Sequence, residues 1–264
     1  MADQHAIADI QSRIEYPEIN HISFGDILEV LGKGFEDFRK KPSHMIFLCI
    51  FYPIIGLILV RLTFGYDIVP LLYPLIAGFA LLGPLAAIGL YEISRRREAG
   101  QDVSWRHAFG IFYAPSIWSI VILGGLLMCI FFAWLLTADI IYASLFGTYQ
   151  PNSPVDLLNR IVNTTEGHQL IVLGNSTGLL FAFSVFIISA ISFPMLLDKH
   201  VSAATAVITS MRVIYHNPIA MLGWGLTIAV SLFLGALPFF IGLVVVMPVL
   251  GHATWHLYRK VVRF

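Results

Sequence analysis

The residues best suited to chemistry in this 264-residue chain lie in the stretch ALLGPLAAIGLYEISRRREAG, residues 80–100. Glu92 and Arg96 are four residues apart, so on a helix they share a face with the acid first, the favourable order for an ion pair. The three consecutive arginines Arg95, Arg96 and Arg97 could anchor a membrane helix, contact anionic lipid or bind a partner. Two interpretations stay open for Glu92: pairing at the membrane interface, which is the simpler, or a gating or partner-docking role with these arginines.

A second pair with chemical potential is His252 and His256, which are also four residues apart and therefore share a helix face. Imidazoles at this spacing could bind a metal or a haem iron, but two ligands do not fill a coordination sphere. Trp255 and Tyr258 beside them are typical of the aromatic belt at a membrane surface. We therefore expect no metal site and no cofactor, with these histidines as weak candidates.

The sequence GNSTG at 174–178 matches the G-x-S-x-G pattern of serine hydrolases. That motif requires a strand before the serine and a helix after it, whereas here it lies in an apolar run with no sheet nearby. Metalloprotease, P-loop and dinucleotide-binding motifs are absent as well. The sequence does not indicate an enzyme.

The elements that must position these residues are transmembrane helices. The chain is 58% hydrophobic and only 12% charged, against about 25% charged in a soluble domain. Its apolar residues gather in blocks of about 18–25, the length that a helix needs to cross a bilayer. We expect an all-α, polytopic membrane protein with about six spans, at roughly 45–64, 70–93, 115–137, 169–193, 218–235 and 239–257.

The distribution of positive charge predicts the orientation. All but two of the 16 Lys and Arg residues, Arg61 and Arg160, fall on one side of these spans. By the positive-inside rule, both termini face the cytoplasm, which for a bacterial protein means the inner membrane. The formal net charge is zero, so no nucleic-acid partner is indicated.

The six spans form three hairpins of one repeated design. Before the first, third and fifth spans, an amphipathic stretch with one apolar stripe ends at Pro42, Pro115 or Pro218, which predicts a helix in the cytoplasmic interface followed by a corner. Each returning span carries a proline toward its cytoplasmic half, and we expect helix kinks at Pro84, Pro194 and Pro248. All copies start on the same side, which predicts parallel repeats.

Two regions flank or interrupt this single membrane domain, which we place at residues 23–264. Residues 1–22 are expected to form a disordered cytoplasmic tail, and Ser23 with Asp26 a capping box for the first interfacial helix. About residues 138–168 are expected to form a long outer loop. Within it, PNSPVDLLNRIVN predicts a short surface helix started by Asn152, Ser153 and Pro154.

The stretch GFALLGPLAAIGLYEISRRREAGQDVSWRHAF resembles the core of an uncharacterised bacterial family of integral membrane proteins. The resemblance extends from about Phe24 to the C-terminus and is strongest around Gly83-Pro84 and Tyr91-Glu92. Some members of that family are labelled as a cytochrome c oxidase subunit. A catalytic oxidase subunit needs several histidines inside its spans, and this chain lacks them, so the resemblance implies at most an accessory role.

Two functions remain open at this stage. The first is a non-catalytic accessory, assembly or interaction factor for a membrane complex, which would contact the lipid bilayer and a membrane-protein partner and could form homo-oligomers. The alternative is a transporter or channel for a small solute, with a water-filled path lined by hydroxyl groups. The hydroxyl-bearing residues that would line such a path are Ser184, Ser189, Ser192 and Thr227.

Overall fold

The structure is a computed structural model, and almost all of its secondary structure is helical. It describes residues 17–40, 50, 54–58, 61, 69–104, 106–107, 110, 112, 114, 116–147, 149, 151 and 153–264. The predicted all-α class is confirmed, with one pair of two-residue strands added to it.

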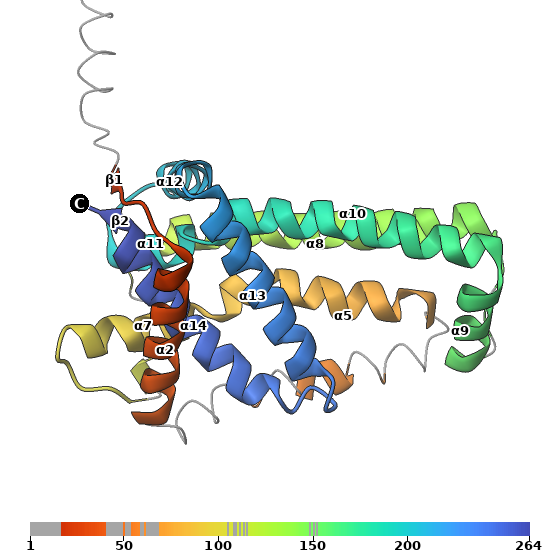
Figure 1. Cartoon of the computed structure of the whole chain (residues 1–264), viewed down its shortest axis with the longest axis horizontal. Helices are drawn as coiled ribbons and strands as arrows, with labels where there is room; N and C mark the ends of the chain where they lie inside the picture. The colour runs from red at the N-terminus through yellow and green to blue at the C-terminus, as the bar shows by residue number, and fades with distance from the viewer. Residues whose placement is uncertain are drawn as a thin grey trace, which may run out of the picture.

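Three helices in the described part are long and apolar enough to cross a membrane: α8 (Ile117–Phe146), α10 (Thr165–Ser189) continued by α11 (Ser192–Asp198), and α13 (Pro218–Ala236). α8 and α10 lie side by side along the length of the molecule, as Figure 1 shows. The first predicted span, 45–64, falls largely outside the described residues. The count of six spans therefore stays a prediction.

The second predicted span, 70–93, is not one continuous helix. It consists of the 3-10 turn η1 (Val69–Leu71), α5 (Leu72–Leu81), α6 (Gly83–Ala86) and α7 (Ile88–Glu98). Pro84 lies in the first turn of α6, because proline has no N–H to continue the ladder of α5. The helix is interrupted next to Pro84, where a kink is predicted, and α5 runs beside α8 (Figure 1).

The two other predicted kinks differ from each other. Before Pro194, the helix breaks between α10 and α11. There the hydroxyl of Ser210 accepts from the N–H of Ile191 at 3.3 Å and donates to the carbonyl of Ile187 at 2.7 Å. A side chain of α12 (Ala203–His216) thus satisfies backbone groups that the break leaves inside the protein. By contrast, α14 (Leu243–Val261) continues through Pro248 without a break.

The prediction of a long outer loop at 138–168 is wrong, because helices occupy most of that range. α8 continues to Phe146 because residues 138–146 contain no glycine or proline, and it ends at Gly147, which adopts a positive φ of 62°. α9 (Pro154–Asn163) follows, and α10 already begins at Thr165. The short helix was predicted correctly, since the Ser153 side chain accepts from the N–H of Asp156 at 3.1 Å.

The end of the predicted N-terminal tail is structured. β1 (Glu18–Ile19) pairs antiparallel with β2 (Val262–Arg263), so Glu18 lies opposite Arg263. The side chain of Asn217 accepts from the N–H of Ile22 at 2.9 Å and donates to the carbonyl of Asn20 at 3.1 Å. The boundary expected at residue 22 was placed too late, because partners distant in sequence hold residues 18–22.

In the described part, helices lie at two of the three stretches for which interfacial helices are predicted. α2 (Phe24–Lys40) and α12 both lie across the direction of α8 and α10, as does α9 at the opposite end (Figure 1). Ser23 and Asp26 form the predicted capping box, with N–H to carboxylate and N–H to hydroxyl distances of 2.7 and 3.3 Å. The stretch before Pro115 lies largely outside the described residues.

α13 and α14 form the predicted tight hairpin. Gly235 and Gly242 approach so closely that a Cβ on Gly242 would lie 2.7 Å from the carbonyl oxygen of Gly235. The connection is longer than the predicted GALP turn, and it includes Phe239 and Phe240 at positive φ values of 51° and 64°.

Candidate functional site

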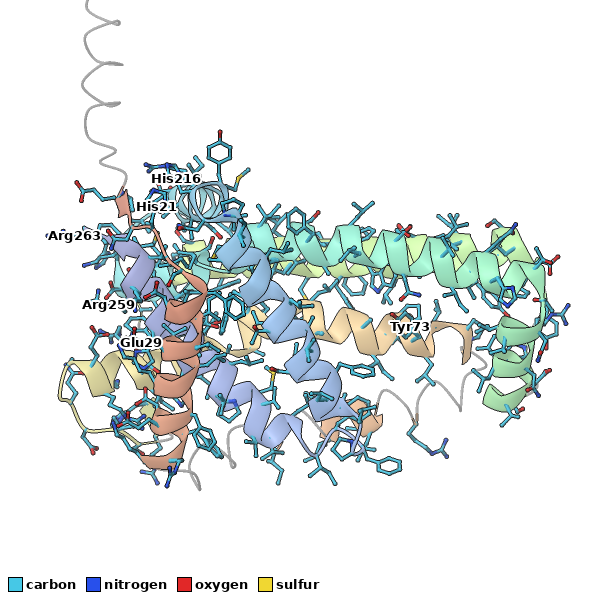
Figure 2. The ribbon with its side chains drawn as sticks, in the orientation of Figure 1. His21, Glu29, Tyr73, His216, Arg259 and Arg263 are labelled. Carbon is cyan, nitrogen blue, oxygen red and sulfur yellow. The ribbon has the colours of Figure 1, made fainter. Side chains whose placement is uncertain are left out.

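The candidate site lies where α2, α7 and α14 pack together at one end of the molecule. A Cβ on Gly34 of α2 would lie 2.5 Å from the carbonyl oxygen of Val249, and one on Gly251 of α14 would lie 2.7 Å from the Leu90 side chain. These glycines let three helix backbones approach closely. In Figure 2, Glu29 and Arg259 mark this charged end, well away from Tyr73.

Glu92 is the centre of the first ion-pair group. Its side chain is only 3% exposed, and its carboxylate accepts from Arg95 Nε at 2.8 Å, Arg95 Nη2 at 2.9 Å and Arg96 Nε at 2.7 Å. The predicted pair with Arg96 is therefore present, and Arg95 adds a bidentate one. The carboxylate raises the pKa of Arg95 above its usual value. Glu92 thus pairs with two arginines of its own helix.

Arg97 points elsewhere, to Asp37 of α2. Its Nη1 donates to Asp37 Oδ1 and to the Asp37 carbonyl, both at 2.9 Å, while Asp37 Oδ2 lies 2.9 Å from His256 Nε2. Burial alone would raise the pKa of Asp37, but the hydrogen bond with His256 and the charge of Arg97 outweigh it and hold that pKa at about 2. Asp37 thus joins α2, α7 and α14 as an ionised carboxylate.

The two histidines predicted as weak metal ligands have separate partners. His252 is fully buried, and its Nδ1 lies 2.6 Å from the hydroxyl of Ser94, whereas His256 pairs with Asp37. Among the described residues, no group of three or more His, Cys, Asp or Glu side chains could hold a metal ion. The structure therefore does not join these histidines to further ligands in the part that it describes.

A third group of polar contacts surrounds the end of α14. Glu98 accepts from Trp255 Nε1 at 2.9 Å and from Arg259 Nε at 3.0 Å. Asp198 accepts from the hydroxyl of Tyr258 at 2.8 Å. Lys260 pairs with Asp26 and Glu29 of α2.

Sequence reasoning found Glu92 because its partners lie three and four residues away on the same helix. It missed Asp37 and Glu98, whose partners are 60 to 219 residues distant along the chain. No local spacing signals such contacts. The one available hint was an acid, Asp37, next to the apolar stripe of an amphipathic helix.

The four hydroxyl groups proposed to line a solute path do not converge. Ser184, Ser189, Ser192 and Thr227 each donate to the carbonyl four residues earlier in the chain, at 2.5 to 2.8 Å. Such back-bonding uses the one donor of each hydroxyl within its own helix.

A separate cavity of about 510 Å³ lies toward the opposite end, between η1, α5, α8, α9 and α10. Its lining is almost entirely apolar, and the polar groups there have partners: Trp134 Nε1 donates to the Pro74 carbonyl, and the Tyr73 hydroxyl donates to Asn175. None of the predicted site residues lies in it.

Comparison with known proteins is consistent with this architecture. Residues 72–198 match the model of a family described as "Predicted integral membrane protein (DUF2189)". That segment begins with α5 and ends with α11, and it includes Glu92 and the three arginines, whereas the resemblance seen in the sequence extended over a longer range. Searches of curated proteins and of solved structures found no match. Over residues 72–198, the chain is therefore similar to a family of predicted integral membrane proteins.

Proposed function

We propose that this integral membrane protein is a non-catalytic accessory or assembly factor that binds another membrane protein. The observation that carries the proposal is that polar side chains bond within this protein. The charged side chains around α7 pair with one another, and the hydroxyls of Ser184 and Ser189 on α10 bond to the backbone of their own helix. The long helices instead turn large apolar side chains outward.

The outward faces of α8 and α13 are the surfaces available for a partner. On α8, Ile122 and Leu136 are 64% and 65% exposed, and on α13 Leu222 is 66% exposed. Lipid chains or another transmembrane helix can pack on such a face by van der Waals contact. A respiratory complex is the partner suggested by the label that some family members carry.

The orientation belongs to the same proposal. β1 and β2 pair, so residues 18 and 263 lie at the same end of the molecule. A chain that begins and ends on one side crosses the bilayer an even number of times. Because α8, α10 and α13 make an odd number, this supports at least one further crossing, and the positive charge at that end favours the cytoplasmic face of a bacterial inner membrane.

Photocrosslinking in native membranes tests the proposal. A photoreactive residue at position 122, 136 or 222 should form a covalent product with a second membrane protein, and one at the fully buried position of Leu127 should not. The purified protein in liposomes should show no flux of small neutral or anionic solutes.

Two results would count against an accessory role. One is solute flux that depends on Ser189 and Ser192, which would favour the transporter. The other is a set of crosslinks that contain only this chain, which would indicate a homo-oligomer instead.

A further inference from the structure

The charged end of the molecule contains a cavity of about 430 Å³ between α2, α7 and α14. It receives side chains from all three helices, and the positively charged ones outnumber the acidic ones. The five basic residues that line it are Lys33, Lys40, Arg97, Arg259 and Lys260.

Both acids in the lining already have their oxygens engaged. Asp37 accepts from Arg97 through Oδ1 and meets His256 through Oδ2. Glu98 accepts from Arg259 through Oε1 and from Trp255 through Oε2. Asp26, Glu29 and Glu36 pair with the lysines nearby, and Asp198 pairs with Arg259 at 3.4 Å, but these four acids do not line the cavity.

The basic groups have more donors than these acids accept. Arg97 makes both of its bonds to Asp37 through the single nitrogen Nη1, although a guanidinium carries five N–H donors. Lys33 meets Glu29 at 2.7 Å, although an ammonium carries three donors. A cavity with this excess of charged donors suits an anion, above all one with several acceptor oxygens.

The position of the cavity relative to the predicted spans indicates which kind of anion it would bind. The lining residues on α7 begin at Ser94, just after the predicted span end at residue 93. On α14, Arg259 and Lys260 follow the predicted span end at residue 257, and His256 directly precedes it. Its third wall, α2, lies across the long helices as an interfacial helix does (Figure 1). By the predicted span ends this is the level of lipid headgroups, where basic pockets between membrane helices bind anionic headgroups.

We propose that this cavity binds the phosphate of an anionic membrane lipid. Arg97 and Arg259 contact the phosphate from the floor formed by α7 and α14. Lys33 and Lys40, which are half exposed on α2, contact it from the open side. The bound lipid thereby joins α2 to the other two helices.

Lipid binding to the full-length protein in a neutral detergent tests this. Phosphatidylglycerol and phosphatidylcholine are offered in equal amounts, and native mass spectrometry and the melting temperature report what binds. The wild type should retain phosphatidylglycerol and be stabilised by it. The double variant Lys33→Gln/Lys40→Gln should bind it roughly 25-fold more weakly, at roughly fivefold for each lysine near the membrane surface.

Arg39→Gln is the matched control, because Arg39 lies on the exposed side of the same helix and does not line the cavity. It should bind phosphatidylglycerol like the wild type. Equal weakening by Arg39→Gln would reduce the effect to general surface charge and overturn the proposal. Equal retention of phosphatidylcholine would overturn it as well. Stabilisation by inorganic phosphate as large as that by the lipid would identify a soluble anion as the occupant.

Discussion

At the residue scale, Asp37 is the group on which three helices depend. Its carboxylate is 8% exposed and faces Arg97, which is 17% exposed, and His256, which is 22% exposed. Removing one member of a buried pair leaves the other charge without compensation, so the cost exceeds that of a surface pair. Glu36, its neighbour in the chain, pairs with Lys40 but is 66% exposed, and an exposed pair contributes little.

Asp37→Asn should therefore lower the free energy of unfolding at neutral pH by about 2 kcal/mol, whereas Glu36→Gln should change it by less than about 0.5 kcal/mol. The pKa of Asp37 in the folded protein, about 2, lies below its ordinary value of 3.8. The stabilisation is thus complete above about pH 4 and is lost as the pH falls toward 2. Thermal unfolding in detergent from pH 7 to pH 2 measures this.

The difference between wild type and Asp37→Asn should shrink over that acid range. A difference that stays constant down to pH 2 would show that the charge of Asp37 is not its source. An equal loss of unfolding free energy in Glu36→Gln would also show that the buried ion pairs of Asp37 are not the source of the stabilisation.

At the element scale, the packing of α2 on α14 rests on one glycine. A Cβ on Gly34 would meet the backbone of α14 at Val249 and Ala253 at 2.5 to 2.8 Å, and backbone cannot move aside as a flexible side chain can. Gly32, half a turn away, has nothing within 4 Å of a Cβ. The two glycines are on the same helix, but only Gly34 packs against another helix.

Gly34→Ala should destabilise the protein by about 2 kcal/mol, because the helices must separate to admit the methyl group. Gly32→Ala should instead stabilise it by up to about 1 kcal/mol, the helix propensity that alanine adds. The melting temperatures of both variants in the same detergent decide the matter. Shifts of the same sign in both variants would contradict the close approach of α2 and α14.

At the scale of the whole molecule, the charged and apolar ends are far apart. Arg263 and the charged network lie at one end, and α9 with the apolar cavity lies at the other (Figures 1 and 2). α9 crosses the direction of α8 and α10 there and exposes Val155, as an interfacial helix would. This arrangement gives the membrane orientation a direct test.

Single cysteines at positions 18, 159 and 263, in a chain whose Cys49 and Cys129 are replaced by Ala, should report opposite sides. Positions 18 and 263 pair through the two strands and should react only after the inner membrane is made permeable. Position 159 is exposed on α9 and should react in intact cells with a permeant outer membrane. Reaction of 159 and 263 from the same side would refute the proposed topology.

Much of this molecule could be predicted from local sequence because the causes are local. Apolar runs give α8, α10 and α13, prolines give the breaks before Pro84 and Pro194, and Ser23 and Ser153 cap α2 and α9 through backbone groups three residues away. The ion pair of Glu92 with Arg96 could be predicted for the same reason, since the two residues are four apart on one helix. Each of these effects depends only on residues that are close to one another in the chain.

The rest was decided only by the tertiary structure. The residues around Asp37 in the chain do not predict its ion pairs with Arg97 and His256. Likewise, those around Glu18 do not predict its pairing with Arg263 in the two strands. The predicted loop at 138–146 is helix because it contains no glycine or proline, and Gly147 at positive φ ends it. Sequence alone determined which segments are apolar helices. The tertiary structure determined which charges meet at their ends, because an ion pair between helices depends on distances that spacing along one helix does not contain.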